Sequence, residues 1–201
     1  WPAGMIVSPL LNGAPTDLNA RLAPHDAQAA KALLAQAGYP EGFSVGLQCP
    51  SGRYVFDEQI CVAIAAMLGR IGIRATLQVE PVAKWSVRLN TNDVSLYMVG
   101  HAGLPMADAY AVLTDVAATQ SRIAGSLNAG RYSNPAFDAL LPRIAGEIDP
   151  AKRRTLIREA VELERNDFAH IPLHQQPITW AAKRGIDLRQ APDNLLRLWL
   201  V

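Results

Sequence analysis

Residues 26–79 read DAQAAKALLAQAGYPEGFSVGLQCPSGRYVFDEQICVAIAAMLGRIGIRATLQV, and their apolar spacing changes period three times along the stretch. In the first part, AQAAKALLAQA repeats apolar residues at helical spacing. Asp26 stands at the N-cap position of this pattern and Gly38 follows its end, so we predict a helix between them. Residues 43–48 then alternate apolar with small or polar side chains, which is typical of a strand with one buried face.

The second half of the stretch repeats this order. A helix is predicted over about 57–70, and residues 73–79 again alternate as a strand. The predicted inner stripe of this helix consists of Ile60, Ile64, Met67 and Leu68. A strand, a helix and a strand in about forty residues form a βαβ unit, whose two strands are parallel and whose crossover is right-handed.

The following residues extend the sheet. A helix is predicted over 82–90 with Trp85 and Leu89 facing inward, and residues 94–99 form a third apolar strand. Further on, Asn134-Pro135 and Asp149-Pro150 each place a capping side chain directly before a proline, which predicts two more helix starts. The fold class is therefore α/β, with a mainly parallel sheet and helices on both faces.

The tail returns to extended patterns. Residues 171–173 and 178–182 are predicted to be extended, and residues 195–200 are strongly apolar.

Composition excludes several functions. Half of the 201 residues are hydrophobic, which suits a compact domain, and 19 Lys and Arg against 18 Asp and Glu leave no basic excess for nucleic acid. The apolar runs are far shorter than the roughly 20 residues of a membrane span. The sequence opens at Trp1 without an initiator Met or a leader, so we interpret it as a piece of a longer protein.

The two cysteines, Cys49 and Cys61, are twelve positions apart at the end of one predicted strand and in the following helix. A disulfide between them is conceivable, but the pattern favours two reduced, buried thiols. Two cysteines without a CxxC spacing or a nearby pair of histidines do not form a zinc site.

Residues with catalytic chemistry are not arranged in any of the usual motifs. The sequence contains no GxSxG, GxGxxG, Walker or HExxH pattern. His170 and His174 are separated by Pro172 in an extended run and are interpreted as structural or cleft-lining residues. We therefore predict no catalytic residue, no metal site and no cofactor.

Candidate ligand-binding residues follow the predicted strands, at the edge where open α/β folds bind their ligands. Arg53 and Tyr54 follow the first strand, with a guanidinium suited to a carboxylate and a flat aromatic face. His101 follows the third strand among small residues, and Arg131 precedes the helix that starts at Asn134. The alternative for each of them is a solvated loop side chain.

Four segments resemble one family. They are AKALLAQAGYPEGF at 30–43, IAAMLGRIGIRATLQ at 64–78, GRYSNPAFDALL at 130–141 and IPLHQQPITWAAKRGI at 171–186. Their order and spacing resemble the carboxyl-terminal part of the periplasmic solute-binding proteins of the peptide/nickel class of ABC importers, extracellular solute-binding protein family 5.

This resemblance implies a lobe of the type II periplasmic-binding-protein fold, one half of a clamshell that closes on a solute. It implies a connector at 1–25, a carboxyl-terminal α/β lobe at 26–170 and a tail at 171–201 that returns toward the amino-terminal lobe. The implied partners are a peptide or other small solute and the membrane permease, with a monomeric protein that is periplasmic, or extracellular and membrane-anchored.

The loop after the third strand departs from the family pattern. Family members typically have Gly-Trp, small residues and an acid that holds a peptide amino group, whereas this chain has Gly100, His101 and then Leu104. The nearest acid is Asp108. This departure argues against a peptide with a free amine and leaves another small polar solute open, with His101, Leu104 and Asp108 as candidate ligand-binding residues. Two other hypotheses are an enzyme whose site is shared with the missing amino-terminal portion, and a lobe that signals to a permease without touching solute.

Overall fold

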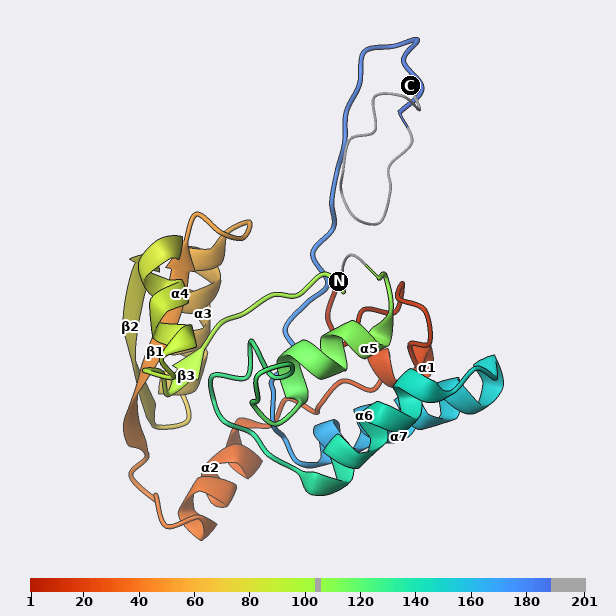
Figure 1. Cartoon of the computed structure of the whole chain (residues 1–201). Coiled ribbons are helices and arrows are strands. Elements are labelled where there is room, and N and C mark those ends of the chain that lie inside the picture. The colour runs from red at the N-terminus through yellow and green to blue at the C-terminus, as the bar shows by residue number, and fades with distance from the viewer. Residues whose placement is uncertain (104–105, 189–201) are drawn as a thin grey trace. The chain divides into compact units, whose positions relative to one another are not determined.

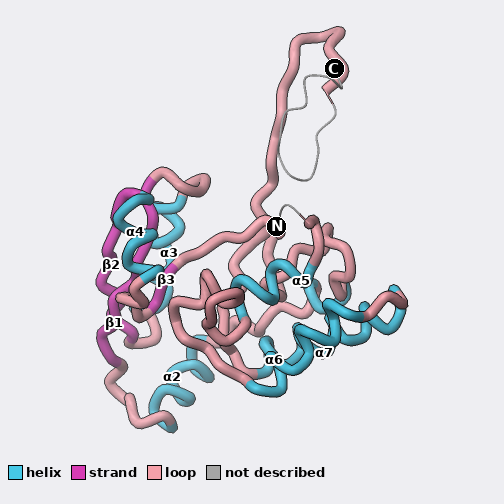
Figure 2. Tube along the Cα trace, viewed as in Figure 1, coloured by secondary structure: helices cyan, strands magenta, loops and turns pink. Residues whose placement is uncertain are grey.

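The computed structural model describes residues 1–103 and 106–188, and in this part the chain forms two compact units. The first unit takes its residues from 1–22, 101–118 and 134 onward, and the second from 23–100 and 119–133. Figure 1 follows the chain through both units, and Figure 2 shows that the strands of the described residues belong to the second. The predicted apolar run at 195–200 lies outside the described residues.

The second unit is built on a three-stranded parallel sheet. Its strands are β1 (Phe43–Ser51), β2 (Ile73–Pro81) and β3 (Leu96–Tyr97), in the order β2-β1-β3. Phe43 lies opposite Ile73, and Leu47 lies opposite Leu96. The predicted parallel pairing is confirmed, although β3 is shorter than the predicted 94–99.

Helices cover both faces of this sheet. Since successive strand residues point to opposite faces, Leu96 and Tyr97 of β3 belong to different clusters. On one face, α3 (Asp57–Gly69) contributes Cys61 to a core with Leu47 and Cys49. On the other, α4 (Val82–Asn90) contributes Trp85 and Leu89, which are 5% and 2% exposed, as the sequence predicted.

Two details of these helices differ from expectation. Met67, predicted on the inner stripe of α3, is half exposed, whereas Ile60 and Ile64 do pack against the core. The predicted first helix is α2 (Ala27–Gln36), with Asp26 as its cap, but none of its residues is buried. Helical periodicity thus located both helices without fixing which apolar side chains become buried.

The prediction of two reduced thiols was wrong, because Cys49 and Cys61 form a disulfide. The cause lies in the βαβ geometry. Cys49 points from β1 toward the face that α3 covers, and Cys61 is on the buried side of α3, so their Cα atoms are 6.5 Å apart. This separation is within the range that a disulfide spans.

The first unit is mainly helical. It contains α1 (Thr16–Asn19), α5 (Ala109–Val112), a π-helical turn at Leu113–Ala117, α6 (Pro135–Gly146) and α7 (Pro150–Asn166). The predicted caps are confirmed, since the side chains of Asn134 and Asp149 each accept two backbone N–H bonds at the starts of α6 and α7. The buried residues of these two helices are Phe137, Leu140, Leu141, Ile144, Ile157, Ala160, Val161 and Glu164.

The amino-terminal segment contributes to this unit's core. Met5 and Val7 are fully buried, and Leu18 is 1% exposed. The backbone of residues 1–3 bonds to that of 173–175, with an isolated antiparallel bridge between Pro2 and His174. The division into a connector at 1–25, a lobe at 26–170 and a tail at 171–201 concerns the longer protein and stays a prediction.

Candidate functional site

The end of β1 and the loop that joins it to α3, together residues 51–56, carry two of the predicted ligand-binding residues. The loop is organised by Asp57, a 5%-exposed side chain at the start of α3. One carboxylate oxygen of Asp57 accepts the backbone N–H groups of Arg53 and Tyr54 at 2.8 and 3.0 Å. Burial raises the pKa of Asp57, but the backbone hydrogen bonds from Tyr54, Arg53 and Glu58 outweigh burial and hold it below its ordinary value.

Tyr54 connects this loop to the end of the third strand. Its hydroxyl donates to the carbonyl of Gly100 at 3.2 Å and accepts the N–H of Gly100 at 2.9 Å. The ring lies so close that a Cβ on Gly100 would be 2.9 Å from its Cε1 atom. The loops after β1 and β3 therefore meet at the carboxyl edge of the sheet, which is the arrangement that the parallel order requires.

Arg53 and Arg131 present free cationic groups in the second unit. The Arg53 guanidinium lies 5.4 Å from the centre of the Tyr54 ring, in a cation–π contact. Both arginines are exposed, and neither forms an ion pair with a carboxylate of residues 1–103 or 106–188. These guanidinium groups are chemically suited to a carboxylate or another anion.

A buried asparagine that sequence reasoning missed shapes the turn around Arg131. Asn128 is 1% exposed, and its side chain bonds to both the N–H and the carbonyl of Tyr132, at 2.9 and 2.7 Å. Arg131 lies between them with a positive φ of 60°. Asparagine before a tight turn is a recognisable signal, but its burial is visible only in the fold.

His101 belongs to the first unit and has both ring nitrogens engaged. Its Nδ1 accepts the N–H of Gly103 at 2.8 Å, and its Nε2 lies 2.9 Å from a carboxylate oxygen of Asp115. Since Nδ1 is an acceptor, the proton resides on Nε2 and is donated to Asp115. The bonds to Gly103 and Asp115 hold His101 in one tautomer, and its side chain is 13% exposed.

Asp108 also has its oxygens engaged within the first unit. Its side chain accepts two bonds from Arg153, one from Asn12 and one from the N–H of Tyr110 at the start of α5. Burial raises its pKa, and these partners together lower it below the ordinary value. Leu104, predicted beside these residues, lies outside the described residues.

The predicted site residues thus fall into two sets. Arg53, Tyr54 and Arg131 are in the second unit, and His101 and Asp108 are in the first. The structure links Arg53 directly to Tyr54.

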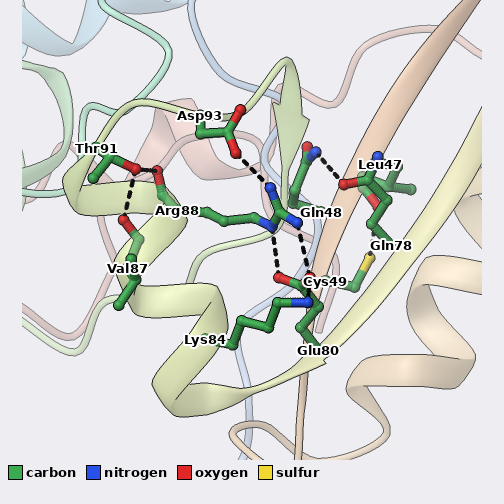
Figure 3. Close-up of polar contacts among 10 residues, drawn as sticks. All are labelled: Leu47, Gln48, Cys49, Gln78, Glu80, Lys84, Val87, Arg88, Thr91 and Asp93. Carbon is green, nitrogen blue, oxygen red and sulfur yellow. Dashed lines mark hydrogen bonds and ion pairs between the residues drawn. The ribbon is translucent and has the colours of Figure 1, made fainter.

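A charged cluster beside α4 was not predicted. Glu80 at the end of β2, 8% exposed, bonds to Lys84 at 2.7 Å and to Arg88 at 2.7 and 3.0 Å, and Arg88 also contacts Asp93 (Figure 3). Bonds from Arg88 and Lys84 lower the pKa of Glu80 to about 2. The cluster joins β2 to α4.

Among the described residues, no group of three or more His, Cys, Asp or Glu side chains is placed to hold a metal ion, and no helix is long and apolar enough to cross a membrane. His170 bonds to the buried Glu164 at 2.8 Å, and His174 is exposed.

Comparison with known families gives a match over most of the chain. The family model for bacterial extracellular solute-binding proteins, family 5 (Middle), matches residues 1–122. Among curated proteins, Heme-binding protein A of Haemophilus influenzae is 26% identical over 153 residues, 75% of this chain and 27% of its own length. Glutathione-binding protein GsiB of Salmonella paratyphi A is 24% identical over 168 residues, 81% of this chain and 32% of its own.

Solved structures agree in fold. The periplasmic binding protein DppA from Helicobacter pylori, in complex with the peptide STSA, superposes with a TM-score of 0.73 at 26% identity, over 86% of this chain and 33% of its own. The binding protein AgaA from A. tumefaciens R10, in complex with agropinic acid, has a TM-score of 0.74 at 24% identity, over 86% and 35%, and supports the fold alone. The chain spans about a third of the length of these relatives.

Proposed function

Because this chain belongs to the bacterial extracellular solute-binding proteins of family 5, we propose that it is the carboxyl-terminal lobe of the substrate-binding component of an ABC importer. In this role the whole protein captures a peptide or other small polar solute between two lobes and delivers it to a membrane permease. The observation that carries the proposal is the family match over residues 1–122, which includes the parallel sheet and the loops at its carboxyl edge.

The family and the structural neighbours are binding proteins, and we extend this to the chain itself, which we propose makes and breaks no covalent bond. The names of the relatives point to different solutes, among them heme, glutathione and peptides. The chemical class of the solute therefore has to be inferred from the side chains that this chain presents. Among the candidate site residues, Arg53 and Arg131 are exposed cations, which favours a solute with at least one anionic group.

Each predicted site residue has a place in this proposal. We propose that Arg53 and Arg131 contact solute directly, and that Tyr54 offers its ring face while its hydroxyl holds Gly100. His101 and Asp108 shape the loop after β3 through their bonds to Gly103 and Arg153. Leu104 is proposed as a further solute contact on the basis of the sequence alone.

We further propose that the protein is monomeric and works in the periplasm, or outside the cell with a membrane anchor. The matched relatives include proteins named as periplasmic. The Cys49–Cys61 disulfide supports an oxidising compartment, since cytosolic proteins rarely keep such bonds.

The experiment compares the full-length protein with residues 1–201 alone. Native mass spectrometry of the intact protein purified from the periplasm identifies a retained solute, and calorimetry then measures its affinity for both proteins. We expect tight binding by the full-length protein and weak binding by residues 1–201, because two lobes enclose a ligand and remove it from water better than one. Equal affinity would contradict the two-lobe site, and conversion of the solute to a product would favour an enzyme.

A further inference from the structure

The disulfide closes a loop that contains two of the proposed solute contacts, Arg53 and Tyr54. Cys49 lies near the end of β1 and Cys61 in the first half of α3, and both are fully buried. The residues between them include the whole connection 51–56, with Arg53 and Tyr54. The disulfide therefore fixes β1, where residues 51–56 begin, relative to α3, into which they lead.

The connection itself has little apolar burial to hold it. Val55 and Phe56 are 53% and 69% exposed, and Gly52 and Arg53 are also exposed. Phe56 has a φ of 59°, a left-handed conformation that costs free energy for a residue with a side chain. A loop with these properties keeps one conformation only if other bonds impose it.

Two further sets of contacts hold residues of the loop that the disulfide closes. Asp57 accepts the N–H groups of Arg53 and Tyr54, which fixes the backbone of both residues. The Tyr54 hydroxyl bonds to both backbone groups of Gly100, and the rings of Tyr54 and Trp85 form a T-shaped contact with a centroid distance of 6.5 Å. Arg53 lies over that ring, so the position of its guanidinium depends on Tyr54.

We propose that the Cys49–Cys61 disulfide and Tyr54 are positioning elements of the solute site, which hold residues 51–56 in the binding conformation before solute arrives. This inference rests on the proposed function. A preformed loop removes the ordering cost that solute would otherwise meet on binding. Because both cysteines are fully buried, the bridge is a permanent part of the site and is shielded from reductants in solution.

The test uses the full-length protein in four forms: wild type, the double variant Cys49→Ser/Cys61→Ser, Tyr54→Phe, and Tyr39→Phe as the control. Tyr39 is half exposed, and its ring packs on Phe43, the first residue of β1. The Tyr39→Phe variant therefore removes a hydroxyl at the end of β1 that is opposite to Tyr54. Hydrogen exchange of residues 51–56 is measured without solute. Affinity and association rate are measured with the solute that copurifies with the wild type.

We expect faster exchange confined to residues 51–56 and to Gly100 in the double variant and in Tyr54→Phe, with Tyr39→Phe like the wild type. Affinity should fall about tenfold in both, mainly through a slower association rate, because a smaller fraction of molecules has the loop in its binding conformation. A role in stability alone would leave the association rate unchanged.

The outcomes separate the two proposals. Wild-type protein that binds no solute would refute the proposed function and the solute role of the loop with it. Solute binding by the wild type, with unchanged affinity and unchanged exchange in Tyr54→Phe and in the double variant, would refute the positioning role alone. If the double variant fails to fold, Tyr54→Phe decides the question, because it removes one hydroxyl and leaves the disulfide in place.

Discussion

Arg153 on α7 binds both carboxylate oxygens of Asp108, at distances of 2.8 and 3.0 Å. The same carboxylate accepts a bond from Asn12 and caps the N–H of Tyr110. Asp108 therefore ties α5, α7 and the amino-terminal segment together. A solute amine would have to displace one of these partners to reach it.

Replacing Asp108 with Ala should lower the free energy of unfolding by roughly 3 kcal/mol, because it breaks a partly buried ion pair and removes a helix cap. Chemical denaturation of the full-length protein measures this loss. Glu159→Gln is the control, since Glu159 is an exposed carboxylate on the same helix as Arg153. Wild-type stability together with a large loss of solute affinity would instead make Asp108 a solute contact.

Removal of the disulfide in Cys49→Ser/Cys61→Ser should cost about 3 kcal/mol of unfolding free energy, the loop-closure value for a ring of this order. The parallel pairing of β1 with β2 remains in the variant, so circular dichroism should show the native secondary structure. Urea titration gives the free energy and the slope m. A midpoint equal to that of the wild type would contradict a stabilising bridge.

The stabilisation that the Glu80 carboxylate provides should be lost in acid. The pKa of Glu80 is about 2 in the folded protein, because Arg88 and Lys84 favour the carboxylate, against an ordinary value of 4.5. The folded state then binds this proton less readily than the unfolded state, so the stabilisation is complete above pH 4.5 and is lost as the pH falls toward 2.

Thermal unfolding of Glu80→Gln between pH 2 and pH 7 tests this assignment. The variant should be less stable than the wild type at neutral pH, and its stability should fall less steeply below pH 4.5. Some acid dependence should remain, since the pKa values of Asp57 and Asp108 are also lowered. Glu41→Gln, an exposed carboxylate before β1, serves as the control. Parallel pH profiles for Glu80→Gln and the wild type would show that the ion pairs of Glu80 with Lys84 and Arg88 (Figure 3) contribute nothing.

Arg53→Gln and Arg131→Gln should each weaken solute binding by about ten- to a hundredfold in the full-length protein, the usual size of a charged hydrogen bond. Isothermal titration calorimetry measures the affinity. Arg70→Gln is the matched control, because this exposed arginine follows the end of α3 and so lies at the edge of the sheet opposite to Arg53. Equal affinity for all three variants would remove both arginines from the site.

Much of the fold follows from local sequence signals. Strands β1 and β2, helix α4 and the capped helices α6 and α7 lie close to where periodicity and capping residues predicted them. The third strand lies where it was predicted but is shorter than predicted, because only two of its residues pair with β1. The placement of Arg53, Tyr54 and His101 after strands was also predictable, since parallel strands bring their carboxyl ends to one edge.

Sequence by itself established the α/β class, the βαβ unit and the order of helices and strands, because caps and apolar periods act over a few neighbouring residues. Tertiary structure alone decided that Cys49 bonds to Cys61, that Tyr54 holds Gly100, and that the Asp108 carboxylate is occupied by Arg153. These contacts join residues 12 to 46 positions apart. Their formation depends on how strands and helices pack, which no local pattern encodes.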